Sequence, residues 1–390
     1  MRLSRDHRNV GILSLCQALM STAQTVLIIL SGLVGAMLAA DKALATLPIS
    51  SVVVGTLMTT VPASFLMKRV GRRAGFIFGS ALGLVGALIA ALAIYLQSFW
   101  LFSLGTLVIG GNVGFSQYYR FAAADAVAAN FRPRAISLVL AGGVIAAIIG
   151  PELAKATTDL MAPIPFLGAY MTIAAIPVIS AAILSFLDIP NLSAHEVADP
   201  GRPVLEIARQ PAFVVAVLSG MVGYGVMSLV MTATPLAMIG CGFGVADAAM
   251  VIQWHVVAMF APSFVTGNII QRFGVLRVML CGVVLLAACT AAALAGLDIV
   301  NFWLAMVTLG LGWNFAFVGA STLLTETYQP SERAKVQATN DFFVFGSVAL
   351  ASLSSGAFLH YLGWDAVQLL ALPFLFVAAG AILWLEYQRR

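Results

Sequence analysis

The sequence predicts an all-α integral membrane protein with twelve transmembrane helices in two six-helix halves. Of its 390 residues, 61% are hydrophobic and 9% are charged, whereas soluble domains carry about 25% charged residues. Apolar runs of roughly twenty residues or more, long enough to cross a hydrocarbon core as helices, recur along the whole length. They lack the alternating polarity of a transmembrane β-barrel. Because no stretch remains for a soluble catalytic domain, we expect that the chain is not an enzyme.

Each predicted helix is an apolar run between polar loops. The first run is longer than the apolar core of a signal peptide, so we interpret it as a retained helix. The twelve spans are 12–38, 44–66, 75–97, 100–127, 135–158, 166–187, 212–239, 246–271, 275–296, 300–325, 335–358 and 364–386.

The basic residues indicate how the spans are oriented. Placing the N-terminus inside makes 17 of the 20 Lys and Arg residues cytoplasmic, while Lys42 and Lys155 fall outside and Arg120 lies within a span. The 17 are Arg2, Arg5, Arg8, Lys68, Arg69, Arg72, Arg73, Arg132, Arg134, Arg202, Arg209, Arg272, Arg277, Arg333, Lys335, Arg389 and Arg390. This bias predicts that both termini are cytoplasmic. Since the net charge of +4 is spread over short loops, we expect no nucleic-acid partner.

The longest polar stretch divides the chain into equal sets of spans. It contains three prolines between residues 188 and 210 and is expected to be a cytoplasmic linker. The predicted domains are therefore an N-terminal half (1–187), a linker (188–211) and a C-terminal half (212–390).

The two halves share short motifs. Arg69-Val70-Gly71 recurs as Arg272-Phe273-Gly274, GGNVGF at Gly110 as GLGWNF at Gly310, and FRPRA at Phe131 as PSERA at Pro330. A parallel repeat of this kind predicts a substrate cavity near the membrane midplane between the halves.

Two motifs resemble those of the major facilitator superfamily. MKRVGRRAGF, from Met67 to Phe76, is similar to the family's loop between the second and third helices, and AGGVIAAIIGP, from Ala141 to Pro151, to its glycine-rich fifth helix. Leu66-Met67 stand where an aspartate is usual. The resemblance covers the whole chain and implies scaffold and gating roles. It places in the inner gate Lys68, Arg69, Gly71, Arg72 and Asp125.

Soft ligands are grouped in two neighbouring spans of the second half. Met227 and Met231 are four residues apart in the seventh span, as are His255 and Met259 in the eighth, so each pair lies on one helix face. At 1.5 Å per residue, Met231 and His255 are both roughly 12–13 Å from the outer membrane edge. The two pairs are therefore expected to lie level and to converge on one site.

Thioether and imidazole ligands favour a soft metal. Monovalent copper accepts both, whereas calcium, magnesium and manganese need carboxylate oxygens. Silver would bind in the same way. The stretch from Met221 to Phe264 also resembles the CcoA-like copper importers of the superfamily, whose MxxxM and HxxxM motifs match these four residues. The resemblance implies copper import for assembly of cbb-type haem-copper oxidases; relatives in this branch without the metal motifs carry riboflavin.

A few other residues have candidate roles. Cys241, at the outer end of the seventh span, is a possible accessory copper or thiol-exchange residue, although a small packing residue is the other interpretation. Arg120 and Asp341 lie within spans, where a charge is costly, so either is a candidate for proton coupling; Arg120 is equally well explained as part of a gate. Glu152 and Lys155 are expected to form a local ion pair.

The sequence thus predicts a monomeric importer of copper, as Cu(I), in the bacterial inner membrane, surrounded by lipid. Copper is its substrate, and we expect no permanently bound cofactor; the copper donor and acceptor proteins and the driving force are left open. One alternative is a carrier of an organic solute, riboflavin or an exported drug, with stacking residues Tyr118, Tyr119, Trp254, Trp313 and Phe315. Another is a receptor or assembly factor that holds copper without transporting it.

Overall fold

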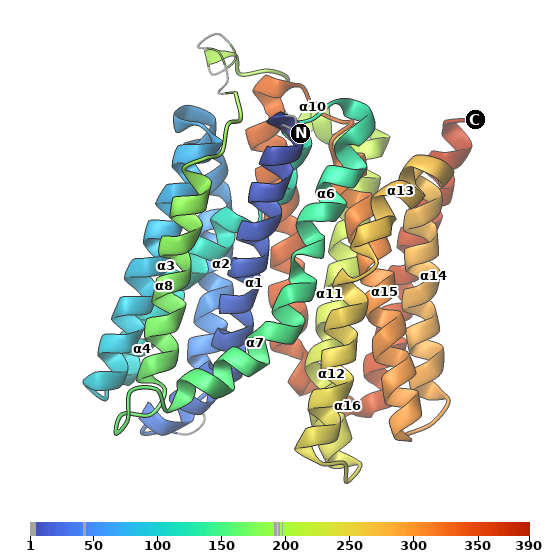
Figure 1. Cartoon of the computed structure of the whole chain (residues 1–390). Helices are drawn as coiled ribbons and strands as arrows, with labels where there is room; N and C mark the ends of the chain where they lie inside the picture. The colour runs from blue at the N-terminus through green and yellow to red at the C-terminus, as the bar shows by residue number, and fades with distance from the viewer. Residues whose placement is uncertain (1–4, 42–43, 191–192, 194–195, 197) are drawn as a thin grey trace. The chain divides into compact units, whose positions relative to one another are not determined.

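A computed structural model describes residues 5–41, 44–190, 193, 196 and 198–390 (Figure 1). Every regular element in these residues is a helix. Arg2 and Lys42, with parts of the proposed linker, lie outside the described residues.

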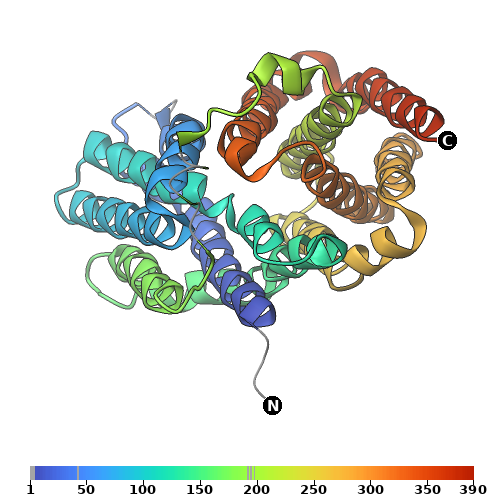
Figure 2. The ribbon, with the colours of Figure 1, turned by 90° about the horizontal axis from the view of Figure 1, so that it is seen from above.

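The chain forms two compact units, residues 1–127 with 142–200 and residues 128–141 with 201–390. The first unit contains α1 (Arg5–Leu38), α2 (Leu47–Val70), α3 (Arg72–Tyr95), α4 (Phe99–Ser116), α5 (Tyr119–Asp125), α7 (Gly143–Thr158) and α8 (Leu167–Leu184). The second contains η2 (Ala129–Phe131), α6 (Arg132–Ala141), α10 (Val204–Ala208), α11 (Pro211–Gly240), α12 (Val245–Phe260), α13 (Ser263–Phe273), α14 (Val275–Leu294), α15 (Ile299–Leu324), η3 (Pro330–Glu332) and α16 (Arg333–Gln388). Figure 2 shows the helices of each unit from above.

The number of spans agrees with the sequence prediction. Within the described residues, ten helices are long and apolar enough to cross a membrane, and the bent pair α12 and α13 makes eleven. The long α16 is interrupted at Gly363, whose φ of 83° is not helical. Counting its two segments separately gives twelve, so the predicted all-helical, multi-pass membrane fold is confirmed.

Three predicted continuous spans are broken. The fourth divides into α4 and α5, the fifth into α6 and α7 at Gly142, and the eighth into α12 and α13 with a 42° bend. Pro262 explains the last break, since proline has no N–H for the preceding turn and its ring crowds that turn. The first helix also begins at Arg5, earlier than the predicted residue 12, because hydropathy does not report the polar turns that continue a helix beyond the membrane.

The repeated RxG motifs have the same local geometry in both units. Gly71 ends α2 and begins α3 with φ of 88°, and Gly274 ends α13 and begins α14 with φ of 89°. Only glycine adopts this backbone region readily. Each motif is therefore a tight turn between consecutive membrane helices.

An ion pair at one end of the second unit joins the segment before α10 to η3. Glu332, in η3, is 1% exposed and accepts hydrogen bonds from the Arg202 guanidinium at 2.7 and 2.8 Å and from the Arg202 backbone N–H at 2.9 Å. Gln210 donates to the Thr327 carbonyl at 3.0 Å, a carbonyl that Arg202 also reaches. Hydrogen bonding from Arg202 lowers the pKa of Glu332 to about 2.

We expect Glu332→Gln to destabilise the protein at neutral pH by about 2 kcal/mol, because charge-assisted hydrogen bonds are lost. Since the pKa of Glu332 falls on folding from 4.5 to about 2, its contribution is complete above about pH 4.5 and is lost as the pH falls towards 2. Thermal unfolding, followed by tryptophan fluorescence, should separate variant and wild type at pH 7 and less so at pH 3.

Glu152→Gln is the control, since Glu152 pairs with Lys155 at 2.8 Å on an exposed surface where an ion pair contributes little. An equal loss of thermal stability in both variants would show that the Glu332 hydrogen bonds do not stabilise the attachment of the segment before α10.

Candidate functional site

His255 lies on the α12 face that packs against α15. Its side chain is fully buried, and its Nδ1 lies 2.8 Å from the backbone carbonyl oxygen of Met306. Because a carbonyl only accepts, Nδ1 carries the proton, and the neutral ring presents a lone pair at Nε2. Nε2 is buried and has no hydrogen-bond partner among the described residues.

Met306 connects α12 with α11. Its Sδ accepts a hydrogen bond from the Thr234 hydroxyl of α11 at 3.2 Å, while its carbonyl holds His255. Thr234 and His255 therefore lie near the same turn of α15, which places these parts of α11 and α12 level with each other. Sequence reasoning missed Met306, since a methionine in an apolar helix carries no distinguishing pattern.

The four predicted copper ligands are buried to different degrees. Met227 is 4% and Met259 6% exposed, whereas Met231 is half-buried. No hydrogen bond in the described part of the chain joins the imidazole to Met227 or Met231. The described residues also contain no group of three His, Cys, Asp or Glu side chains suited to a metal. The geometry joins His255 to Met306, and the four-residue copper site stays a prediction.

A buried polar network holds the break between α12 and α13. Asn314 of α15 donates from Nδ2 to the Met259 carbonyl at 2.6 Å and to the Ser263 hydroxyl at 2.5 Å, and its Oδ1 accepts from the Thr266 hydroxyl at 2.7 Å. Asn314 and Thr266 are fully buried. The Asn314 side chain therefore bonds to residues on both sides of the helix break and fixes the C-terminal end of α12.

The same break is held from α6. Ser137 donates its hydroxyl proton to the Ser263 carbonyl and accepts from the Gly267 N–H at 3.1 Å. A Cβ at Gly267 would lie 2.6 Å from the Arg134 Cα, so the two backbones are in contact. The short helices α6 and α13 thus form one packed pair.

An aromatic cluster surrounds Tyr224 of α11. Its ring lies edge-on to Trp313 and Phe317 at centroid distances of 5.2 and 5.1 Å, and to Phe345 at 5.7 Å. Phe260, the last residue of α12, contacts Trp313 at a centroid distance of 5.5 Å. Tyr224 and Phe260 are partly exposed, whereas Trp313 is 2% exposed. The Trp313 indole N–H is buried without a hydrogen-bond partner among the described residues.

The predicted gate residues all lie in the first unit. Arg72 and Asp125 form a buried ion pair at 2.9 Å, and Lys68 donates to the Asp199 carbonyl at 3.1 Å. Met67 accepts from Arg72 through Sδ at 3.8 Å. Arg69 is exposed. The Arg72 guanidinium therefore contacts both a carboxylate and a thioether.

The predicted coupling residues lie in different units. Arg120 is 2% exposed, donates to the Gln117 carbonyl at 2.6 Å and lies 4.3 Å from the Phe121 ring centre. Asp341 is fully buried and accepts from the Asn340 side chain at 2.8 Å. Cys241 is an exposed free thiol directly after α11.

The aromatic residues suggested for an organic substrate are dispersed. Trp313 belongs to the cluster, whereas Trp254 is 48% exposed beside Trp303. Tyr118 and Tyr119 are buried in the first unit, and Tyr118 donates to the Thr60 carbonyl at 2.7 Å. Sequence reasoning missed Tyr224, whose ring contacts three other aromatic rings. The available signal was its position three residues before Met227 in the helix that carries the first copper motif.

The sequence matches the Major Facilitator Superfamily over residues 13–262 and 242–390. The chain belongs to this superfamily. It is 43% identical over 368 residues to the riboflavin transporter RfnT of Brucella anthropi, covering 94% of this chain and 92% of that protein. Membership identifies a secondary transporter and not an enzyme.

Solved superfamily structures have the same fold. The human organic anion transporter MFSD10 superposes with a TM-score of 0.79 at 14% identity, covering 97% of this chain and 99% of that one. The Escherichia coli fucose:proton symporter FucP gives 0.74 at 17% identity, with 96% and 98% covered. The superfamily prediction is confirmed, and the assignment to its copper-importing branch stays a prediction.

Asn314→Leu should destabilise the transporter by about 1–2 kcal/mol, a large value for polar contacts between membrane helices. Leucine has a similar size but leaves the Met259 carbonyl and the Ser263 and Thr266 hydroxyls without this partner. Thermal unfolding of the purified protein measures the loss.

Asn301→Leu is the matched control, because Asn301 makes one longer bond, 3.2 Å to the Ala292 carbonyl, near a helix end. Combining Asn314→Leu with Ser263→Ala should cost less than the sum of the single changes. Full additivity would contradict a shared network.

Proposed function

We propose that this transporter carries riboflavin or a closely related flat, uncharged heteroaromatic solute. The proposal rests on the aromatic cluster around Tyr224 and is supported by the 43% identity with RfnT. The predicted organic-solute alternative is thus favoured over copper.

The cluster has the chemistry that a flavin requires. A tricyclic flavin ring offers two apolar faces and a rim of carbonyl and ring-nitrogen groups. Aromatic side chains bind such faces by stacking, and the partly exposed rings of Tyr224 and Phe260 are the accessible members. The Trp313 N–H, without a protein acceptor among the described residues, is a donor suited to a flavin carbonyl or ring nitrogen.

Copper import is the second candidate, because one observation favours it. His255 holds its proton on Nδ1 and leaves Nε2 with a free lone pair in a buried position, the state in which imidazole ligates a metal. The thioethers of Met227, Met231 and Met259 would complete a soft site, with Cys241 as an accessory thiol.

The remaining assignments follow the same proposal. We place the protein as a monomer in the bacterial inner membrane with both termini cytoplasmic, since the basic residues lie in the corresponding loops. The halves 1–187 and 212–390, joined by the linker 188–211, would alternate access by rocking. Lys68, Arg69, Gly71, Arg72 and Asp125 would act in the gate, and Arg120 and Asp341 in coupling.

Uptake into liposomes containing purified protein tests the substrate. Radiolabelled riboflavin should accumulate, and Tyr224→Ala should reduce its apparent affinity roughly tenfold, within the range for one stacking contact with a heteroaromatic ring. Tyr224→Phe should retain uptake because the ring is kept.

Trp254→Ala is the control, since its exposed ring lies outside the cluster. Accumulation of Cu(I) but not riboflavin, abolished by His255→Ala and Met231→Ala, would reject the flavin proposal in favour of copper. Absence of flux for both solutes with intact, folded protein would reject both.

A further inference from the structure

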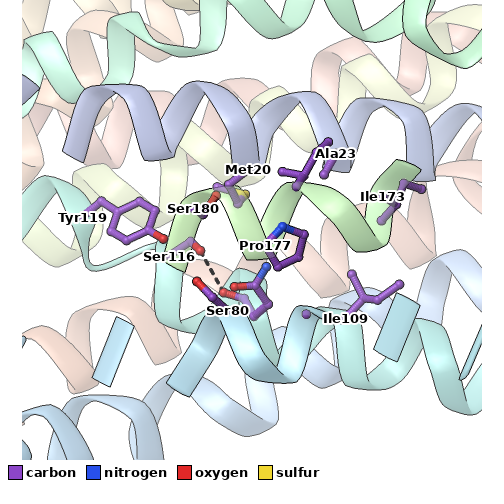
Figure 3. A pocket seen from close by; sticks show the side chains of 12 residues that line it. Met20, Ala23, Ser80, Ile109, Ser116, Tyr119, Ile173, Pro177 and Ser180 are labelled. Carbon is purple, nitrogen blue, oxygen red and sulfur yellow. Dashed lines mark hydrogen bonds between the residues drawn. The ribbon is translucent and has the colours of Figure 1, made fainter. Parts of the chain in front are cut away.

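A small cavity lies inside the first unit, and Tyr119 is the one residue suggested above for an organic substrate that lines it. It is enclosed by α1, α3, α4, α5 and α8 and has a volume of about 20 Å³. Figure 3 shows the side chains of Ser80, Ser116, Ser180 and Tyr119 around it, with Met20 and Pro177. The cavity therefore brings four hydroxyl groups from four helices into an otherwise apolar bundle.

These polar side chains are buried. Ser116 is 1%, Ser80 2%, Tyr119 2% and Ser180 5% exposed. The Ser116 hydroxyl donates to the Asn112 carbonyl at 2.9 Å, while in the described part of the chain the hydroxyls of Ser80 and Ser180 donate to no protein acceptor. Hydroxyls in a membrane interior without partners are costly, so a bound molecule that exchanges hydrogen bonds with them is favoured.

A proline in α8 leaves one backbone carbonyl without its helical donor, at a residue that lines the cavity. Pro177 lies within α8 and has no N–H, so the carbonyl of Ile173 lacks its usual donor four residues later. Ile173 and Pro177 both line the cavity. A freed carbonyl in a membrane helix is commonly satisfied by a side chain or an ordered water.

We propose that this cavity is a binding site for a structural water molecule that bridges α8 to α3 and α4. About 10–15 Å³ is enough to hold one water, and the cavity offers about 20 Å³. The water donates to the Ile173 carbonyl and exchanges hydrogen bonds with the hydroxyls of Ser80, Ser180 and Tyr119. It replaces the backbone hydrogen bond that Pro177 removes.

The lining argues for water over a metal cation. The cavity-lining side chains include no carboxylate, and their polar groups are hydroxyls and one amide, that of Asn112. Hard cations bind preferentially where carboxylates contribute charge. A neutral ligand that can both donate and accept matches hydroxyls, which do the same.

Radiolytic footprinting in ¹⁸O-water tests the site in the full-length transporter. X-ray radiolysis of a bound water generates hydroxyl radical beside it, so Met20 and Tyr119 should incorporate ¹⁸O despite their burial. Met67 and Tyr170, which are 1% and 0% exposed in the same unit, are the controls and should be oxidised several-fold more slowly. Equal oxidation of both pairs would overturn the proposal.

Filling the cavity should remove the label. Ser180→Val and Ser80→Val, from α8 and α3, each replace a hydroxyl with a branched apolar group, and either folded variant should lose the oxidation of Met20 and Tyr119. Ser185→Val, directly after the end of α8 and outside the cavity, should keep it. Retained oxidation in the filled variants, or a rise in melting temperature specific to Na⁺ over choline that Ser180→Val abolishes, would exclude a water site.

Discussion

Contact between helix backbones at glycine is the constraint on which both units depend. A Cβ at Gly110 of α4 would lie 2.3 Å from the Val52 carbonyl oxygen of α2, and one at Gly310 of α15 would lie 2.6 Å from the His255 carbonyl oxygen of α12. Such contacts allow helices to associate in lipid, where burial of apolar surface gives no advantage. The approach at Gly310 sets the register of α15 against α12, and thereby the bonds of Met306 to His255 and of Asn314 to Met259.

The internal repeat explains why His255 is distinctive. Val52 and Thr56 pack against Gly110 in the first unit as His255 and Met259 pack against Gly310 in the second. The Thr56 hydroxyl donates to the Gly110 carbonyl at 3.1 Å. This hydrogen bond joins α2 to α4. At the corresponding level of the second unit, an imidazole reaches the Met306 carbonyl and keeps one nitrogen free. The glycine contact between helices therefore occurs in both units, whereas the imidazole with an unpartnered nitrogen occurs at this position only in the second unit.

The sequence predicted the spans well because a membrane helix is recognisable from its summed hydropathy. It did not predict the breaks at Gly142 and Pro262, since both lie within apolar runs and hydropathy does not register a lost backbone hydrogen bond. His255 could be singled out because polar groups are scarce in the spans. Met306 could not, because it holds His255 through its backbone. Asn314 was visible in GLGWNF, but only the structure shows that its amide joins three groups across a helix break.

The charge of the substrate determines whether its accumulation needs a coupled ion. An inside-negative potential contributes about 2.3 kcal/mol per 100 mV to the entry of one positive charge, so Cu(I) could be drawn inward with no coupled ion. An uncharged flavin gains nothing from the potential, and its accumulation requires a second ion moving down its gradient. Charged side chains are costly within membrane spans, yet Arg120 and Asp341 are buried there. The coupling role proposed above for these two residues would serve a neutral substrate, which needs a coupled ion to accumulate, and would be unnecessary for a cation.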